Sequence, residues 1–228
     1  ITDAITDAVL TDTVTFTVTV KPKAMVTLHE IIYGSLSQKY LTKGIVRLID
    51  PDTFIILEDE TGILYIDLSA SEADLSSVAI GDEIEILGAR SSYNNRGYVP
   101  MLYQIFDWKP LSTNHPAPLS PTPMTITDIL TMDHLDYDSF GHFIEFTGTV
   151  IFSGNASYPS FDLREDGFLT DDYDLEIGGA DYNAFNTLMA DYVGQEVTIE
   201  GYLVGFDYID QPFNWFVRVT KVSPSLGE

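Results

Sequence analysis

Two stretches of the chain repeat each other in the same order. The segment GDEIEILG at 81–88 matches GQEVTIEG at 194–201, and in each one two glycines seven positions apart enclose an alternating strand. Three upstream pairs also match: TLHEII (27–32) with TITDIL (125–130), YLTKGIV (40–46) with FIEFTGTV (143–150), and FIILEDETG (54–62) with FDLREDG (161–167). Four matched blocks in one order predict two copies of one domain, each about 100 residues long.

Apolar alternation and turn residues predict the same elements in both copies. Each copy begins with a short helix set by a capping box, formed by Thr27 and Glu30 in the first copy and by Thr125 and Asp128 in the second. The strands predicted for the first copy are 40–49, 53–58, 62–68, 81–88 and 98–108, with a weak helix or loop at 69–80. Those predicted for the second copy are 143–152, 158–164, 171–177, 195–206 and 213–222.

A longer helix is predicted over 181–194, between the third and fourth strands of the second copy. Apolar residues recur there at i, i+3, i+4, i+7 spacing, which is typical of a helix with one buried face. They are Phe185, Leu188, Met189 and Tyr192. Asp181 is placed to cap this helix and Gly194 to end it.

Composition marks the boundaries between these parts. Within residues 1–23, Thr alternates strictly with Val or Phe, which predicts a strand, and Pro22 ends that strand. We therefore expect residues 1–23 to form a strand that is separate from the two repeats. A proline-rich stretch favours an extended, stiff linker that separates the two copies and holds them apart at a defined distance. The predicted division is an N-terminal strand at 1–23, a first domain at 24–110, a linker at 111–124 and a second domain at 125–228.

The predicted order of strands with a helix between the third and fourth resembles the OB-fold, a five-stranded Greek-key barrel. The segments that carry the resemblance are KGIV (43–46), EDETGILYI (58–66) and GDEIEILG, with TGTV (147–150), REDG (164–167) and GQEVTIEG in the second copy. The resemblance implies a mainly β chain with two OB-fold-like barrels in tandem and short helices. It also implies a kinship with OB modules of exported multi-domain proteins of low-GC bacteria, including those attached to secreted nucleases.

The N-terminal strand resembles the last strand of the immunoglobulin-like modules of bacterial surface proteins. Together the two resemblances imply an extracellular or cell-surface location. No signal peptide is visible, and the chain does not begin with Met, so we expect a piece excised from a longer protein. An alternating strand without a partner is prone to edge pairing, so residues 1–23 are also expected to support a dimer.

The charge of the chain bears on its partners. It has 35 Asp and Glu against 11 Lys and Arg, a formal net charge of −24, and no Cys. Such a surface repels nucleic acid, whose binding draws on Lys and Arg, and the absence of Cys excludes disulfides and thiolate metal sites. A nucleic-acid interface would need a basic groove formed by Lys39, Lys43, Arg47, Arg90 and Arg96. No apolar run is long enough to span a membrane.

Catalytic motifs for metalloproteases, serine hydrolases and nucleotide-binding enzymes are absent. The chain is therefore predicted not to be an enzyme, and a metal-dependent hydrolase is the catalytic alternative. No cofactor is required, but oxygen ligands on an acidic turn suit Ca²⁺, whereas turn aspartates also act as local caps without an ion. The residues of the acidic turn are Asp166, Asp171, Asp172 and Asp174.

Aromatic residues are the third candidate site, because OB barrels bind extended ligands across strands two and three and the flanking loops. The candidates are Tyr65, Tyr93, Tyr98, Tyr158, Tyr173, Tyr208 and Trp215, whereas Phe54 and Phe161 are assigned to the core. Tyrosines beside carboxylates suit glycans better than phosphates. The sequence favours a non-catalytic tandem OB-fold module of a secreted or cell-surface bacterial protein, for ligand or protein binding or for spacing. The alternative is an accessory nucleic-acid-binding module of a secreted nuclease.

Overall fold

A computed structural model describes most of the two repeated copies. The described residues are 23–50, 53–68, 71, 73–91, 101–116, 120–133, 141–155, 157–165, 174–206 and 214–225. The strand and the dimer predicted for residues 1–23 therefore lie outside the described residues, except for Lys23. The chain is mainly β, with its strands in two sheets and three short helices among the described residues.

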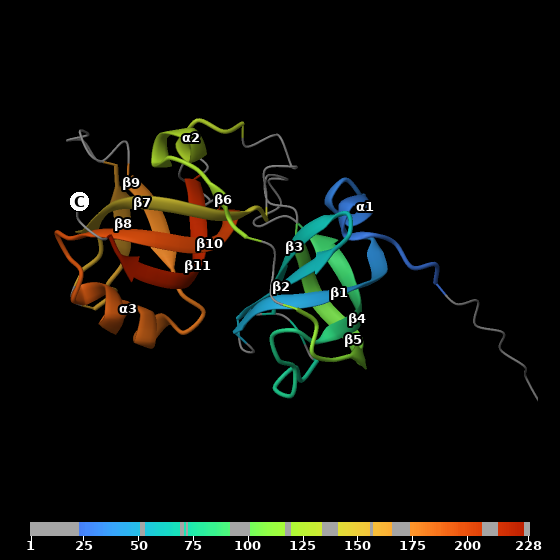
Figure 1. The fold of residues 1–228 in the computed structure, drawn as a ribbon. Helices are drawn as coiled ribbons and strands as arrows, with labels where there is room; N and C mark the ends of the chain where they lie inside the picture. Colours follow the sequence, from blue (N-terminus) through green and yellow to red (C-terminus); the bar gives the residue numbers. More distant parts are fainter. Residues whose placement is uncertain are drawn as a thin grey trace, which may run out of the picture.

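The first sheet is a closed barrel of five strands in the order β1-β2-β3-β5-β4 (Figure 1). β1 pairs with β2 on one side and with β4 on the other, and the parallel pairing of β3 with β5 completes the ring. This order confirms the OB-fold expected from the sequence. The strands are β1 (Lys39–Asp50), β2 (Phe54–Asp59), β3 (Gly62–Asp67), β4 (Glu83–Ser91) and β5 (Met101–Ser112).

The second sheet repeats that order. Its strands follow one another as β10-β11-β9-β8-β7-β6, and β10 also pairs with β7, so the ring closes there. Counted from β7, the second ring has the same sequence of neighbours as the first one. The strands are β6 (Thr122–Pro123), β7 (Phe143–Phe152), β8 (Phe161–Arg164), β9 (Asp174–Gly178), β10 (Glu196–Phe206) and β11 (Asn214–Pro224).

The segment predicted as a linker makes strand pairings and a hydrogen bond with the barrels, which the sequence did not indicate. β5 runs on through Pro110 to Ser112, and Thr122 and Pro123 pair with β7 as the short parallel strand β6. Pro116 accepts a hydrogen bond of 2.6 Å from the Arg47 guanidinium of the first barrel. Because proline lacks only the N–H, its carbonyl still bonds, and the segment lies against both barrels.

The three helices begin at their predicted caps. α1 (Leu28–Ile32) and α2 (Ile126–Leu130) each start with the complete capping box predicted from the sequence. α3 (Tyr182–Ala190) is capped by Asp181, whose carboxylate accepts from the Ala184 N–H at 2.9 Å. α3 ends four residues before Gly194, and the described part of 69–80 contains turns without a helix. In the first barrel, that part of the connection between β3 and β4 lacks the counterpart of α3.

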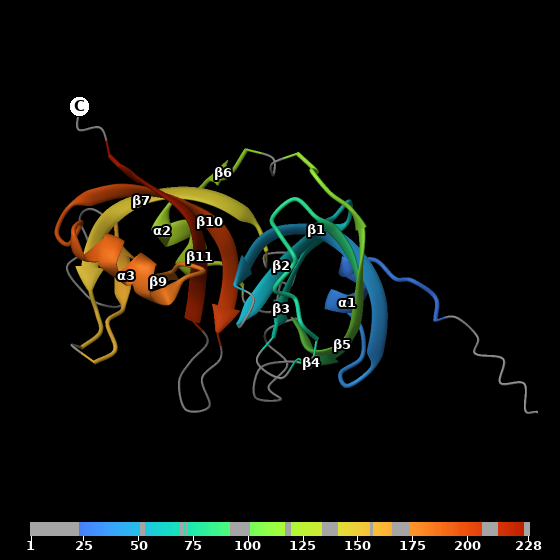
Figure 2. The ribbon, with the colours of Figure 1, turned by 90° about the horizontal axis from the view of Figure 1, so that it is seen from below.

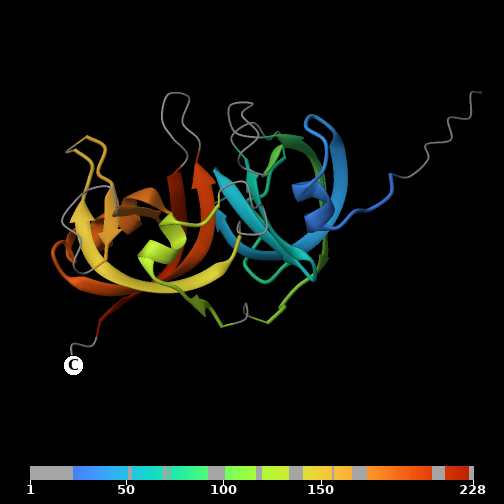
Figure 3. The same ribbon diagram turned by 90° about the horizontal axis from the view of Figure 1, so that it is seen from above.

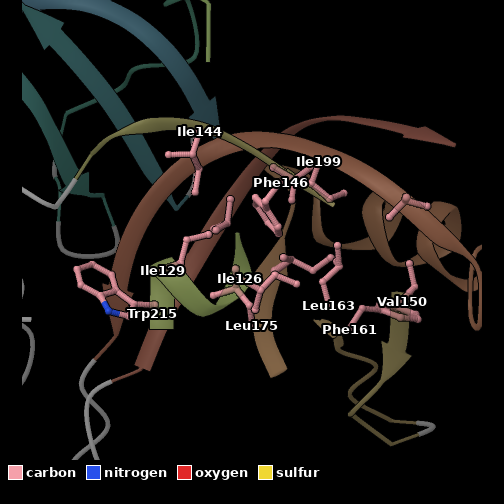
Figure 4. Close-up of a cluster of buried hydrophobic side chains, with 14 of the residues drawn as sticks. Ile126, Ile129, Ile144, Phe146, Val150, Phe161, Leu163, Leu175, Ile199 and Trp215 are labelled. Carbon is pink, nitrogen blue, oxygen red and sulfur yellow. The ribbon is translucent and has the colours of Figure 1, made fainter. Parts of the chain in front are cut away.

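Each barrel has its own apolar core. Figure 4 shows side chains from α2 and from β7 to β11 pointing toward one another inside the second barrel, with Phe146, Phe161 and Trp215 among them. Ile55, Leu57 and Ile66 belong to the core of the first barrel. Phe161 therefore lies in a barrel core, as predicted.

A third apolar cluster joins the two barrels. It contains Leu48, Phe54 and Ile56 of the first barrel and Tyr202 of the second, all of them buried. Figures 2 and 3 show β10 and β11 lying beside β1 and β2, the strands that contribute Leu48, Phe54 and Ile56. The expectation that a stiff linker holds the copies apart is therefore wrong, because the barrels touch through buried side chains.

Candidate functional site

The face of the first barrel on which OB-folds bind ligands is covered by the second barrel. Strand alternation sends Ile55 and Leu57 into the barrel core and Phe54 and Ile56 outward. These outward side chains are fully buried nonetheless, because the second barrel packs on them. Phe54, assigned to the barrel core from the sequence, thus lies between the barrels instead.

Tyr65, a predicted ligand-binding residue, also lies at this junction. Its ring stacks on Phe54 with centroids 5.4 Å apart, and it contacts the cores of both the junction and the second barrel. Burial raises the pKa of Tyr65, and the nearby Arg218 partly opposes that shift. Tyr65 therefore contributes to the contact between the barrels, and one face of its ring is covered by Phe54.

The second barrel contributes Arg218 and Tyr202 to the junction. The guanidinium carbon of Arg218 lies 4.3 Å from the ring centre of Phe54 and 4.7 Å from that of Phe216. Both are cation–π distances, and the desolvated setting strengthens the attraction. Burial raises the pKa of Tyr202 well above its ordinary range. Both side chains point away from the core of their own barrel.

The corresponding face of the second barrel is acidic. Asp162 and Glu176 are direct partners across β8 and β9, where like charges disfavour each other. Burial raises the pKa of Glu176, and Asp162 adds to the increase. They line a pocket of about 460 Å³ together with Asp174 and Trp215. An anionic ligand would meet repulsion on this face.

The predicted calcium turn is only partly within the described residues. Asp166, Asp171 and Asp172 lie outside them. Asp174 makes a bidentate ion pair with Arg164, with both N–O distances at 2.6 Å. Among the residues that the structure describes, no three His, Asp or Glu side chains come together as a group that could hold a metal ion.

Two other acidic turn residues have structural partners. Asp59, the last residue of β2 before the β2–β3 turn, accepts hydrogen bonds from the Leu28 N–H at 2.9 Å and from the N–H groups of Thr61 and Gly62. Glu165, at the matching position of the second copy, accepts from the N–H and hydroxyl of Thr127. Each carboxylate thus ties the start of a helix to a hairpin, which explains why the acidic turn recurs in both copies.

The predicted basic residues are distributed over different roles. Arg47 and Arg90 are buried, and they bond to Glu58 and to the backbone carbonyl of Ile32. Lys43 pairs with Glu83 at 2.8 Å, a contact that raises the pKa of Lys43 and lowers that of Glu83. Arg96 lies outside the described residues. Lys39 is exposed, with its ammonium 3.7 Å from the ring centre of Phe106.

The predicted aromatic residues are also dispersed. Trp215 is buried in the core of the second barrel, and Tyr158 is 75% exposed on the β7–β8 loop. Tyr93, Tyr98, Tyr173 and Tyr208 lie outside the described residues. Of the candidates that the structure describes, Tyr158 is largely exposed, Tyr65 is partly buried and Trp215 is buried.

Beside Tyr158 lies a groove that the sequence did not reveal. It runs between the β7–β8 loop and α3, has a volume of about 420 Å³, and includes Phe152, Tyr182, Asn183 and Asn186 in its walls. The apolar spacing of the helix drew attention to its buried side, yet Leu188 from that set is exposed. The groove is lined by the other side of α3, which carries Tyr182, Asn183 and Asn186 after the cap. That polar and aromatic side was not considered in the sequence.

The comparisons with known proteins concern the fold. No protein-family model and no curated protein matches the chain. The telomere capping protein Ten1 from Saccharomyces pombe is 15% identical with a TM-score of 0.32, over 39% of this chain and 81% of that one. The Ifi202 HINa domain, solved in complex with 20bp dsDNA, is 9% identical with a TM-score of 0.37, over 83% of this chain and 98% of that one. A chain of a Replication Protein A heterotrimer bound to ssDNA is 8% identical with a TM-score of 0.30, over 90% of this chain and 70% of that one.

Within the described residues, no helix is both long and apolar enough to cross a membrane.

Proposed function

We propose that the chain is a non-catalytic binding module of a secreted or cell-surface bacterial protein, with its two OB barrels acting as one body. The observation that carries the proposal is the buried cluster that joins the barrels, in which Leu48, Phe54 and Ile56 of the first barrel gather with Tyr202 of the second. The outer face of the first barrel serves as an attachment surface there. Ligand binding is thereby assigned to surfaces away from the junction.

The charge of the chain favours a neutral ligand or a protein partner over a nucleic acid. The net charge is −24, and several cations are already paired: Lys43 with Glu83, Lys109 with Glu85 and Lys221 with Glu200. A phosphate backbone binds by exchanging counterions for free Lys and Arg. Lysines that are already paired with carboxylates on an acidic surface are poorly suited to replace the counterions of a phosphate backbone.

One observation favours the alternative, an accessory nucleic-acid-binding module of a secreted nuclease. The exposed Lys39 lies over Phe106, which is 37% exposed, and a cation beside an aromatic ring is a common element of single-strand binding. Fluorescence anisotropy with a labelled single-stranded DNA, at low and at physiological salt, separates the two functions. The proposed function expects no binding at either salt concentration. Salt-sensitive binding that Lys39→Glu abolishes would establish the alternative in its place.

The proposed location has its own test. An antibody raised against the chain should label intact, unpermeabilised cells of the source bacterium, or detect the chain in the culture medium. A cytosolic protein detected by its own antibody serves as the control for cell lysis. Labelling that requires permeabilised cells would overturn the secreted or cell-surface assignment.

A further inference from the structure

We propose that the groove between the β7–β8 loop and α3 binds a neutral oligosaccharide. This inference rests on the proposed binding function and adds to it a site and a ligand class. The groove has a volume of about 420 Å³, which is within the range of small-molecule sites. It is lined by residues of the second barrel, and Figure 1 shows α3, which forms one of its walls, on the side of that barrel away from the first one.

The groove offers exposed aromatic rings. Phe152 is 45% exposed and Tyr182 is 52% exposed, and both line the groove. The Tyr182 hydroxyl donates a hydrogen bond of 2.8 Å to the Pro159 carbonyl, so its ring is held in one orientation. A ring fixed in this way presents a flat apolar face on which the C–H face of a sugar can stack with little further loss of side-chain freedom.

Amide and hydroxyl groups lie beside these rings. Asn186 donates through Nδ2 to the Pro159 carbonyl at 3.2 Å, which leaves its amide oxygen to accept from a ligand hydroxyl. Asn183 and Thr187 come from the same helix and line the same groove. Sugar hydroxyls both donate and accept hydrogen bonds, and amide and hydroxyl side chains match them in both respects.

The wall opposite α3 is a closely bonded turn. Asn155 and Tyr158 exchange backbone hydrogen bonds of 3.0 and 3.1 Å, and the Ser157 N–H donates to the Asn155 side chain at 2.9 Å. A side chain at Gly154 would place its Cβ 2.3 Å from the Ser160 nitrogen, so this turn requires glycine. The bonded turn therefore fixes this wall of the groove without a ligand, and Ser157 and Pro159 line it from there.

The charge of the groove selects the ligand class. No charged side chain is among the described residues that line it, although the chain as a whole carries −24. An anionic ligand would be repelled by the surrounding field, and a cationic ligand would find no carboxylate in the walls. A neutral, hydroxyl-rich ligand meets all of these conditions.

The test is isothermal titration calorimetry of the full chain with five neutral tetrasaccharides: those of cellulose, starch amylose, xylan, mannan and chitin. The variants are Tyr182→Ala, which removes the ring, Asn186→Ala, which removes the amide, and Tyr182→Phe, which keeps the ring. We expect at least one tetrasaccharide to bind, with affinity falling at least tenfold in the two alanine variants and changing less than threefold in Tyr182→Phe. Tyr103→Ala, an exposed tyrosine of the first barrel, is the matched control and should bind normally.

A second measurement does not depend on the folding of any variant. The side-chain NH₂ resonances of Asn183 and Asn186 in the wild-type chain should shift on titration with the tetrasaccharide that binds. If a tetrasaccharide binds while these resonances stay fixed and the alanine variants bind normally, the groove is the wrong site and the proposed binding function stands. If none of the five binds at millimolar concentration, the ligand class is overturned, and the DNA and cell-surface experiments then decide the proposed function separately.

Discussion

The guanidinium of Arg218 lies 4.3 Å from the ring centre of Phe54, across the boundary between the two barrels. Phe54 stacks on Tyr65 on its own barrel, and Arg218 also lies over Phe216 on the other. The rings and the cation form one continuous stack through the junction. Because a buried stack of this kind is lost as a unit, the two barrels are expected to unfold together.

Replacing Phe54 with alanine tests this coupling. Truncating a buried phenylalanine costs about 3–5 kcal/mol, and at this position the loss falls on the junction between the barrels. We expect the wild-type chain to unfold in one calorimetric transition and Phe54→Ala to unfold in two, with the first at a lower temperature. Phe106→Ala, an exposed phenylalanine of the same barrel, should cost less than about 1 kcal/mol and keep one transition. Two transitions in the wild-type chain would contradict the coupling.

The hydroxyl of Tyr202 gives a second prediction at the junction. Tyr202 is fully buried, and its hydroxyl has no hydrogen-bond partner among the described residues. Burying an unsatisfied polar group costs about 1–3 kcal/mol, so Tyr202→Phe should leave stability unchanged or raise it by up to about 1 kcal/mol. Tyr202→Ala should lower it by about 3–5 kcal/mol through the lost ring. Urea unfolding measures both, and a clear loss of stability in Tyr202→Phe would show that the hydroxyl is satisfied.

Local pattern predicted the strands and the helix caps, whereas the order of the strands around the barrel came from the resemblance to the OB-fold. The repeat aligned Thr27 with Thr125, and both start helices as predicted. The junction was missed, although Phe54 to Leu57 form an unbroken apolar run and all four are buried. Such a run indicates a strand covered on both faces. The alternation of apolar and polar residues along a strand shows which side chains share a face. It does not show what packs on the face that points out of the barrel.

The candidate site was harder to predict than the fold. The sequence selected Tyr158, which is exposed, but it also selected Trp215, which is in the barrel core. The groove depends on a contact between the β7–β8 loop and α3, as in the bond from Tyr182 to Pro159, 23 positions apart. Contacts between distant segments leave no periodic trace in one sequence.

Asp59 tests the structural explanation of the acidic turns. Its carboxylate accepts from three backbone N–H groups, and it joins the start of α1 to the β2–β3 turn. Hydrogen bonds to a charged group contribute about 1.5–3 kcal/mol, so Asp59→Ala should lose about that much in urea unfolding. The neighbouring Glu60 is exposed, and Glu60→Ala is the matched control with little expected effect. Equal losses of stability in the two variants would refute the capping role of Asp59. They would show that the effect comes from removing a negative charge at this turn.

Glu176 predicts how stability depends on pH. Burial, with Asp162 adding to it, raises the pKa of Glu176 above its ordinary value of 4.5 in the folded chain. The folded state therefore binds this proton more tightly than the unfolded state, and its stability falls as pH rises from 4.5 through the raised pKa. Glu176→Gln should be more stable than the wild type at pH 7, and this difference should shrink as pH falls below 4.5. Urea unfolding across this range measures it, with exposed Glu196→Gln controlling for the loss of one negative charge. A variant that is less stable than the wild type at pH 7 would mean that the charged carboxylate stabilises the fold, which would reverse the assignment.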